Sequence, residues 1–156
     1  MSVAFRRESD EEHKEPKFEI PLPPGPNIVT PRGLALIEAR VTELQAAIAA
    51  EAEEEPREAL RRELRYWDTR RATAELAPSP EEGVAGIGTR VRIRMGGAEK
   101  LIDIVGHDEA DPAAGRLAFS APLAHALIGA EEGERVDFNG KPEAIEILEV
   151  GAFPQA

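Results

Sequence analysis

The sequence predicts an α+β protein in which an antiparallel helical hairpin precedes a small, mainly antiparallel β domain with one helix. Over residues 30–77, aliphatic residues recur at alternating spacings of three and four, the pattern of a coiled coil. From residue 89 onward, single apolar and charged residues alternate, which is typical of half-buried strands. The expected organisation is a tail (1–29), a coiled-coil hairpin (30–77), a linker (78–88) and a β domain (89–151).

The first 29 residues mix charges of both signs with five prolines, at positions 16, 21, 23, 24 and 26. Such a segment buries too little apolar surface to offset the entropy lost on ordering. We therefore expect a flexible tail that ends in an extended proline stretch.

The hairpin begins with a clear start signal. Thr30 can accept a backbone N–H bond as the cap, and Pro31 suits the first helical position. Each arm has about 20 residues, hence a length of about 30 Å. Pro56 is unsuited to a helix interior, so we expect the chain to reverse near it. The predicted seam contains Leu34, Ile37, Val41, Leu44 and Ile48 on the first arm and Leu60, Leu64, Trp67 and Ala74 on the second.

Beyond the linker, four strands and one short helix are expected. Residues 89–95 and 100–105 form the first strand pair, around Gly96-Gly97. Residues 122–128 have helical spacing, followed by Gly129 as a C-cap. Residues 135–138 and 144–150 then form a closing hairpin around Asn139-Gly140.

The composition excludes several classes of function. The formal net charge is −11, which disfavours non-specific DNA binding because that mode relies on basic residues displacing counterions. There are no cysteines, so disulfides and thiolate zinc sites are excluded. No apolar run reaches the roughly 18 residues of a membrane span, and no signal peptide is apparent. We expect a cytoplasmic monomer with no membrane association and no specific DNA binding of its own.

Three phrases of the β domain carry a family resemblance. Residues 104–111 read IVGHDEAD, residues 120–129 read SAPLAHALIG and residues 133–136 read GERV. In this order they strongly resemble the C-terminal domain of the bacterial transcript cleavage factors GreA and GreB, with its IVGxDEAD, SPxAxALxG and GDxV. Residues 30–33 are similar to the family's TPxG, and residues 65–70 to the end of the GreB second helix. The chain is identified as a divergent family member with a shortened coiled coil.

The resemblance implies a fold, a partner and a mechanism. The β domain is expected to be FKBP-like and to dock on the rim of the RNA polymerase secondary channel, while the coiled coil enters the channel. In this family an acidic pair at the tip helps hold a second Mg²⁺ in the polymerase active site, where carboxylates fix the hard cation that activates water. The nascent RNA 3′ end is then met only through the polymerase. The factor is not an enzyme and carries no cofactor or stably bound metal of its own.

The tip departs from the family pattern, which has an Asp and a Glu three residues apart. The nearest match is Glu55-Pro-Arg-Glu58, with Glu54, Glu53 and Glu51 as substitutes. These acids either help hold the polymerase Mg²⁺ or form a solubilising turn. With the shorter arms, the alternative function is a non-cleaving channel binder of the Gfh or Rnk type that inhibits or competes with true Gre factors.

The resemblance also assigns polymerase-docking residues: Asp108, Glu109, Asp111, Ser120, Pro122 and Leu123. The alternative for the three acids is a hydrogen-bonded turn between strands. Ala121 replaces the family's Ser before the proline, so Ser120 is expected to cap the helix instead. His107 and His125 are expected at the surface or in packing, because no Cys/His cluster accompanies them.

Arginines form two further candidate surfaces. Arg57, Arg61 and Arg65 share one face of the second arm and either contact channel walls and RNA or pair with Glu38, Glu43 and Glu51. Arg90, Arg92 and Arg94 alternate along the first strand and either contact a partner or pair with nearby acids.

Two other classes of function are weaker. A peptidyl-prolyl isomerase would need an aromatic-lined pocket, and after residue 77 the only aromatic residues are Phe119, Phe138 and Phe153. A plain coiled-coil adaptor would leave the family phrases of the β domain unexplained.

Overall fold

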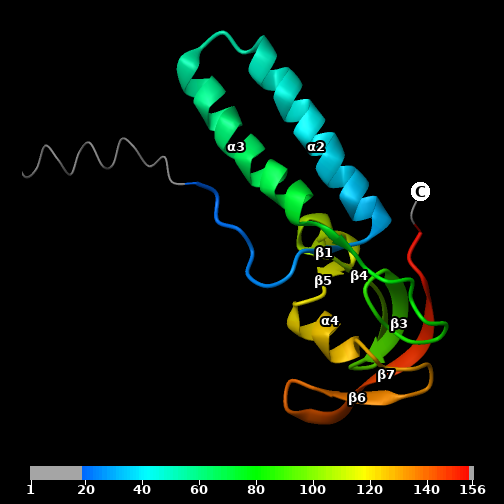
Figure 1. Ribbon diagram of the computed structural model, residues 1–156. Helices are drawn as coiled ribbons and strands as arrows, with labels where there is room; N and C mark the ends of the chain where they lie inside the picture. Colours follow the sequence, from blue (N-terminus) through cyan, green and yellow to red (C-terminus); the bar gives the residue numbers. More distant parts are fainter. Residues whose placement is uncertain (1–18, 155–156) are drawn as a thin grey trace, which may run out of the picture.

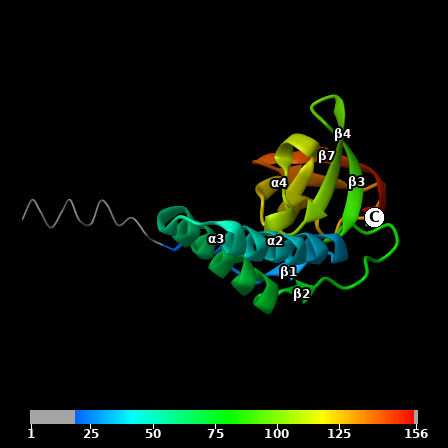
Figure 2. The same cartoon turned by 90° about the horizontal axis from the view of Figure 1, so that it is seen from above.

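The computed structural model describes residues 19–154, so residues 1–18 of the flexible tail predicted for residues 1–29 lie outside the described residues. A helical hairpin projects from a β-sheet domain (Figure 1). Seen from above, the two helices lie side by side and extend away from the sheet (Figure 2). The predicted α+β class, with a helical hairpin ahead of a mainly antiparallel β domain, is confirmed.

The two arms are α2 (Pro31–Ala50) and α3 (Glu54–Thr73). The side chain of Thr30 accepts the backbone N–H of Gly33 at 3.0 Å, so the predicted cap forms. Ile37, Val41 and Leu44 are almost fully buried, because the apolar side of α2 packs on α3.

The chain reverses earlier than predicted. Residues 51–53 make the turn, and Pro56 is the third residue of α3 rather than part of the reversal. The first-turn N–H groups of a helix have no intrahelical acceptor, so a proline there loses no hydrogen bond. Three of the expected tip acids, Glu54, Glu55 and Glu58, therefore lie on the helix and not in the turn.

The base of the hairpin is closed by a short parallel ladder that was not predicted. Strand β1 (Ile28–Val29) pairs with β2 (Glu75–Leu76). Val29 of β1 and the preceding residue, Asn27, are both buried. The end of the segment expected to be flexible is therefore an ordered part of the hairpin base.

The sheet domain has the strand order β5-β4-β3-β7-β6. Its strands are β3 (Thr89–Met95), β4 (Ala98–Val105), β5 (Arg116–Ala118), β6 (Arg135–Phe138) and β7 (Lys141–Ala152). All neighbours are antiparallel except β4 and β5, which are parallel. Two 3₁₀ turns, η1 (His107–Glu109) and η2 (Pro112–Ala114), connect this parallel pair.

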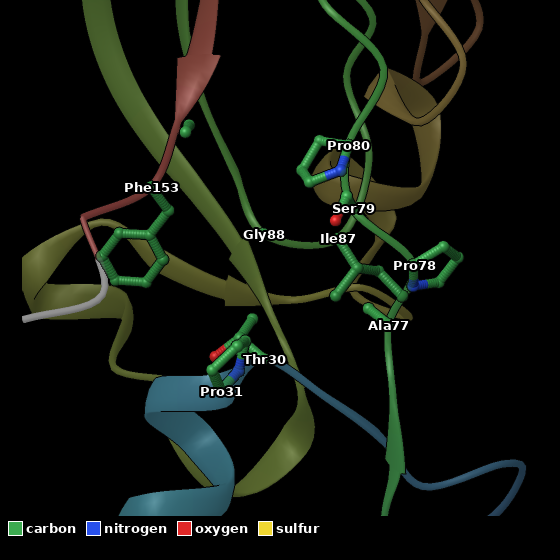
Figure 3. Close-up of a pocket in the computed structure, with 10 residues that line it drawn as sticks. Thr30, Pro31, Ala77, Pro78, Ser79, Pro80, Ile87, Gly88 and Phe153 are labelled. Atoms are coloured by element: carbon green, nitrogen blue, oxygen red, sulfur yellow. The ribbon is translucent and has the colours of Figure 1, made fainter.

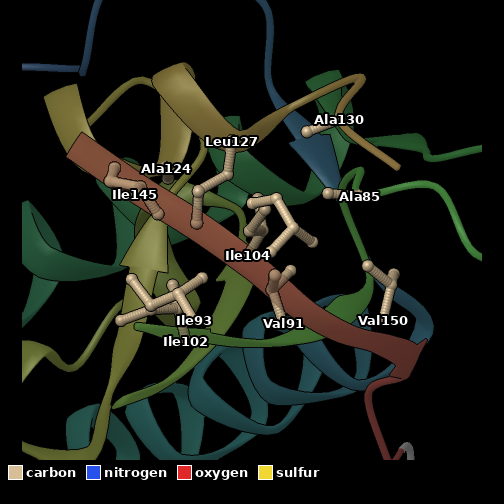
Figure 4. Close-up of a cluster of buried hydrophobic side chains, with 11 residues drawn as sticks. Ala85, Val91, Ile93, Ile102, Ile104, Ala124, Leu127, Ala130, Ile145 and Val150 are labelled. Atoms are coloured by element: carbon tan, nitrogen blue, oxygen red, sulfur yellow. The ribbon is translucent and has the colours of Figure 1, made fainter. Parts of the chain in front are cut away.

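The core lies between the sheet and α4 (Pro122–Leu127). Ala124 and Leu127 of α4 are fully buried and lie with Ile93, Ile104 and Ile145 of the strands (Figure 4). No helix within residues 19–154 combines the length and the apolar character that a membrane crossing requires.

The other face of the sheet carries a set of ion pairs. Arg90 makes two hydrogen bonds to Asp103, at 2.7 and 3.0 Å. Arg92 and Arg94 both reach Glu99, at 3.0 and 3.1 Å. The arginine stripe thus pairs with neighbouring acids, the second of the two readings of this pattern.

Candidate functional site

The acidic residues at the tip of the hairpin differ in whether they have a hydrogen-bond or ion-pair partner. Glu51 accepts the backbone N–H of Glu53 and, through its carbonyl oxygen, two N–H groups of Arg57. Glu54 pairs with Arg61 at 3.3 Å. Within the described residues no ion pair involves the side chain of Glu53 or Glu55, and both residues are exposed.

The arginine face of α3 is partly neutralised by acids of its own arm. Glu58 lies 3.5 Å from Arg61 and 3.6 Å from Arg65, and Arg65 makes two further hydrogen bonds to Glu19, at 2.6 and 3.0 Å. Pairing with neighbours along α3 and with Glu19 therefore replaces the expected pairing with Glu38 and Glu43.

The tip acids do not form a metal site by themselves. Across residues 19–154, no group of three or more His, Asp or Glu side chains is arranged to hold a metal ion. The two exposed carboxylates of Glu53 and Glu55 suit, at most, a hard cation whose other ligands come from a partner.

Two of the predicted docking acids lie at the base of the hairpin, not on an open surface. The carboxylate of Glu109 is 1% exposed, and it accepts the Thr30 hydroxyl at 2.6 Å and Arg32 Nη1 at 2.8 Å. Thr30 thus caps α2 and donates to Glu109 at the same time. A Cβ on Gly33 would lie 2.8 Å from Glu109 Oε1, so glycine leaves the space that this carboxylate occupies.

Asp108 contacts the opposite arm. Its Oδ1 accepts the Tyr66 hydroxyl at 2.6 Å, and its Oδ2 accepts Arg70 Nε at 2.7 Å. The Arg70 and Asp108 side chains are only 4% and 6% exposed. Burial, and then the hydrogen bond to Asp108, raises the pKa of Tyr66 to about 12.

Asn27 completes this arrangement by donating to the Arg70 carbonyl at 2.7 Å and to the Thr73 hydroxyl at 3.1 Å. We refer to these residues as the base cluster: Asn27, Thr30, Arg32, Tyr66, Arg70, Asp108 and Glu109. Sequence reasoning did not find the roles of Asn27, Arg32, Tyr66 and Arg70. The sequence feature that could have indicated this cluster is the presence of both the Thr30–Gly33 phrase and the Asp108-Glu109 dipeptide in one chain.

The remaining predicted docking residues are not members of the base cluster, and they differ in exposure. Asp111, Ser120 and Pro122 are exposed, whereas Leu123 packs partly against the core. The prediction that Ser120 caps α4 is wrong, because Ala121 is the cap residue and no side chain caps this helix. Ser120 Oγ instead lies 3.4 Å from His107 Nε2.

Phe153 joins the end of β7 to the same region. It is 3% exposed, and the guanidinium carbons of Arg32, Arg90 and Arg116 lie 5.7, 5.8 and 5.9 Å from its ring centre. Phe119 and Phe138 pack against the sheet core, so the three aromatic residues that follow residue 77 all serve in packing.

A small cavity of about 210 Å³ lies beside the base cluster (Figure 3). Its walls come from the start of α2, the linker and the end of β7, with Pro31, Pro78, Pro80, Ile87 and Phe153 as the larger apolar residues. None of the residues that line it has an ionisable side chain.

Comparison with known proteins finds a family match that covers the β domain. Residues 80–152 match the family described as transcription elongation factor, GreA/GreB, C-term. The chain is 50% identical over 54 residues to transcription elongation factor GreA of Rhizobium etli (strain CIAT 652), covering 33% of this chain and 34% of that protein. It is 42% identical over 71 residues to GreA of Agrobacterium fabrum, covering 38% and 45%. The chain thus matches less than half the length of these curated relatives.

Two solved structures align with most of the chain but share little sequence with it. Gfh1 of Thermus thermophilus is 13% identical, with a TM-score of 0.38, over 82% of this chain and 100% of that one. GreA/GreB from Nitrosomonas europaea is 17% identical, with a TM-score of 0.39, over 81% and 98%.

Proposed function

Because the chain belongs to the GreA/GreB family of transcription elongation factors through residues 80–152, we propose that it binds RNA polymerase and modulates elongation through the secondary channel. The observation that carries this proposal is the attachment of a narrow helical hairpin to the family domain (Figure 1). Two arms of 20 residues give a rod of about 30 Å, a shape suited to entering a channel.

In this proposal the β domain docks at the channel rim. Asp111, Ser120 and Pro122 are exposed and available to a partner. Leu123 supports this surface from beneath, because it packs partly on the core. The chain acts as a monomer in the cytoplasm, and it meets the RNA 3′ end only inside the polymerase.

The chain is not an enzyme in this proposal, because the catalytic centre is that of the polymerase. Any contribution of the tip to cleavage of backtracked RNA comes from carboxylates that assist a polymerase Mg²⁺. Glu53 and Glu55 are the acids best placed for that role, since both are exposed and outside the ion pairs of the tip.

A second candidate is a non-cleaving factor that occupies the channel and competes with true cleavage factors. The observation that favours it is the neutralisation of the tip by arginines. Glu54 pairs with Arg61, and Glu58 lies within 3.6 Å of both Arg61 and Arg65. Carboxylates in such pairs are weaker ligands for a shared cation.

Both candidates are tested on a backtracked elongation complex of the cognate polymerase. Wild type is compared with Glu55→Ala/Glu58→Ala, with Glu53→Ala/Glu55→Ala, and with a control that removes two acids from the other arm, Glu38→Ala/Glu43→Ala. Faster RNA cleavage that is lost only in the tip variants supports the cleavage role. Absence of cleavage, with displacement of a genuine GreA, supports the competing role. Failure of the full chain to bind polymerase contradicts both.

A further inference from the structure

The adjacent acids Asp108 and Glu109 reach in opposite directions from one 3₁₀ turn. The Asp108 carboxylate binds Tyr66 and Arg70 near the end of α3. The Glu109 carboxylate binds Thr30 and Arg32 at the start of α2. One dipeptide of the β domain therefore holds both arms of the hairpin where they begin and end.

The hairpin and the β domain are joined by close backbone contact as well as by ion pairs. A Cβ on Gly106 would clash with the Ile28 carbonyl oxygen, so the backbone before η1 rests directly against β1. Gly33 likewise leaves room for the Glu109 carboxylate on the α2 side. Backbone contact and two ion pairs with buried carboxylates therefore join the hairpin to the β domain.

We propose that Asp108 and Glu109 are positioning residues that hold the hairpin in one orientation relative to the β domain, and that they do not contact the polymerase. The second half of this inference rests on the proposed function. Both carboxylates are buried against the hairpin, with side-chain exposures of 6% for Asp108 and 1% for Glu109, so an outside partner could reach them only by displacing the hairpin residues that bind them. The docking surface therefore lies among exposed residues such as Asp111 and Ser120.

The orientation can be measured directly because the chain has no native cysteine. Spin labels on Ala52→Cys at the tip and Lys141→Cys at the exposed start of β7 report one distance between the hairpin and the β domain. The chain that carries the two labels and no other substitution should give a single narrow distance distribution. Asp108→Asn/Glu109→Gln should broaden it, whereas the control Glu99→Gln, which removes an exposed carboxylate on the sheet, should leave it narrow.

A second variant changes only the hairpin side of the base cluster. Arg32→Gln/Tyr66→Phe removes one donor from each acid and leaves both carboxylates in place. It should also broaden the distribution, and it decides the question if the first variant fails to fold. An unchanged distribution in this variant would overturn the inference.

Polymerase affinity separates positioning from direct contact. Because the exposed docking surface is unchanged in Arg32→Gln/Tyr66→Phe, the affinity of this variant for polymerase should stay within about twofold of that of wild type. Its effect on elongation at saturating concentration should nevertheless be mostly lost. If Asp108 and Glu109 instead bind the polymerase directly, Asp108→Asn/Glu109→Gln should lower the affinity about tenfold or more while the distance distribution stays narrow, and that result overturns the inference. The label experiment stands even if wild type fails to bind, which would contradict only the proposed function.

Discussion

At the base of the hairpin, the Arg70 and Asp108 side chains are 4% and 6% exposed and meet at 2.7 Å. At the tip, Arg61 and Glu58 are 42% and 44% exposed and meet at 3.5 Å. The residue types are similar, but only the buried pair is protected from water and salt. Burial therefore separates acids that determine the fold from acids that remain available to a partner.

The largest effect is expected when the buried pair is broken. Arg70→Ala leaves the Asp108 carboxylate buried without its ionic partner, and it should lower the free energy of unfolding by about 3–5 kcal/mol. Urea denaturation followed by circular dichroism measures this. A loss as small as that of a surface ion pair would show that the base is no more constrained than the tip.

Backbone contact at the base should give the next largest effect. Gly106→Ala forces a Cβ against the Ile28 carbonyl oxygen and should cost about 1–3 kcal/mol. Gly86→Ala is the matched control, because a Cβ there meets nothing within 4 Å. Thermal unfolding of both variants measures the difference, and equal melting temperatures would contradict close packing at η1.

The Tyr66 hydroxyl should contribute less, about 1 kcal/mol, because one hydrogen bond is removed and the ring stays. Its loss should also change the response to alkaline pH. Burial and the Asp108 contact raise the pKa of Tyr66 from an ordinary value of 10.0 to about 12. This stabilisation is fully present below pH 10.0 and is lost as the pH rises through about 12. Tyr66→Phe should flatten that part of the stability curve, and an unchanged curve would contradict the assignment.

The smallest effect is expected at the tip. Arg61→Ala removes two exposed pairs, with Glu54 and Glu58, each of which should contribute under about 0.5 kcal/mol. Urea denaturation should give nearly the same midpoint as wild type. A loss above about 1 kcal/mol would mean that the tip is as strongly coupled as the base.

Local patterns predicted most of the elements. Spacing and caps placed α2 from Thr30 onward, and alternation placed β3 and β7, because these signals lie within a few residues of one another. The position of the reversal was missed because a proline is tolerated in the first helical turn. Short elements such as β1, β2 and β5 carry too few residues for a pattern.

The base cluster could not be derived from local patterns. Tyr66 and Asp108 are 42 residues apart in sequence, and Thr30 and Glu109 are 79 apart. Their contact depends on how the hairpin packs on the β domain, which no window of sequence contains. The family phrases marked Asp108 and Glu109 as notable, but the phrases alone left both readings open, partner contact and internal turn.

The most direct test of the difference between base and tip is a pair of double-mutant cycles. One combines Arg70→Ala with Asp108→Ala, and the other combines Arg61→Ala with Glu58→Ala, with unfolding free energies measured in urea. The expected coupling is about 2 kcal/mol or more at the base and below about 0.5 kcal/mol at the tip. A base coupling near zero, or equal couplings at both ends, would contradict the role of the base cluster in holding the hairpin to the β domain.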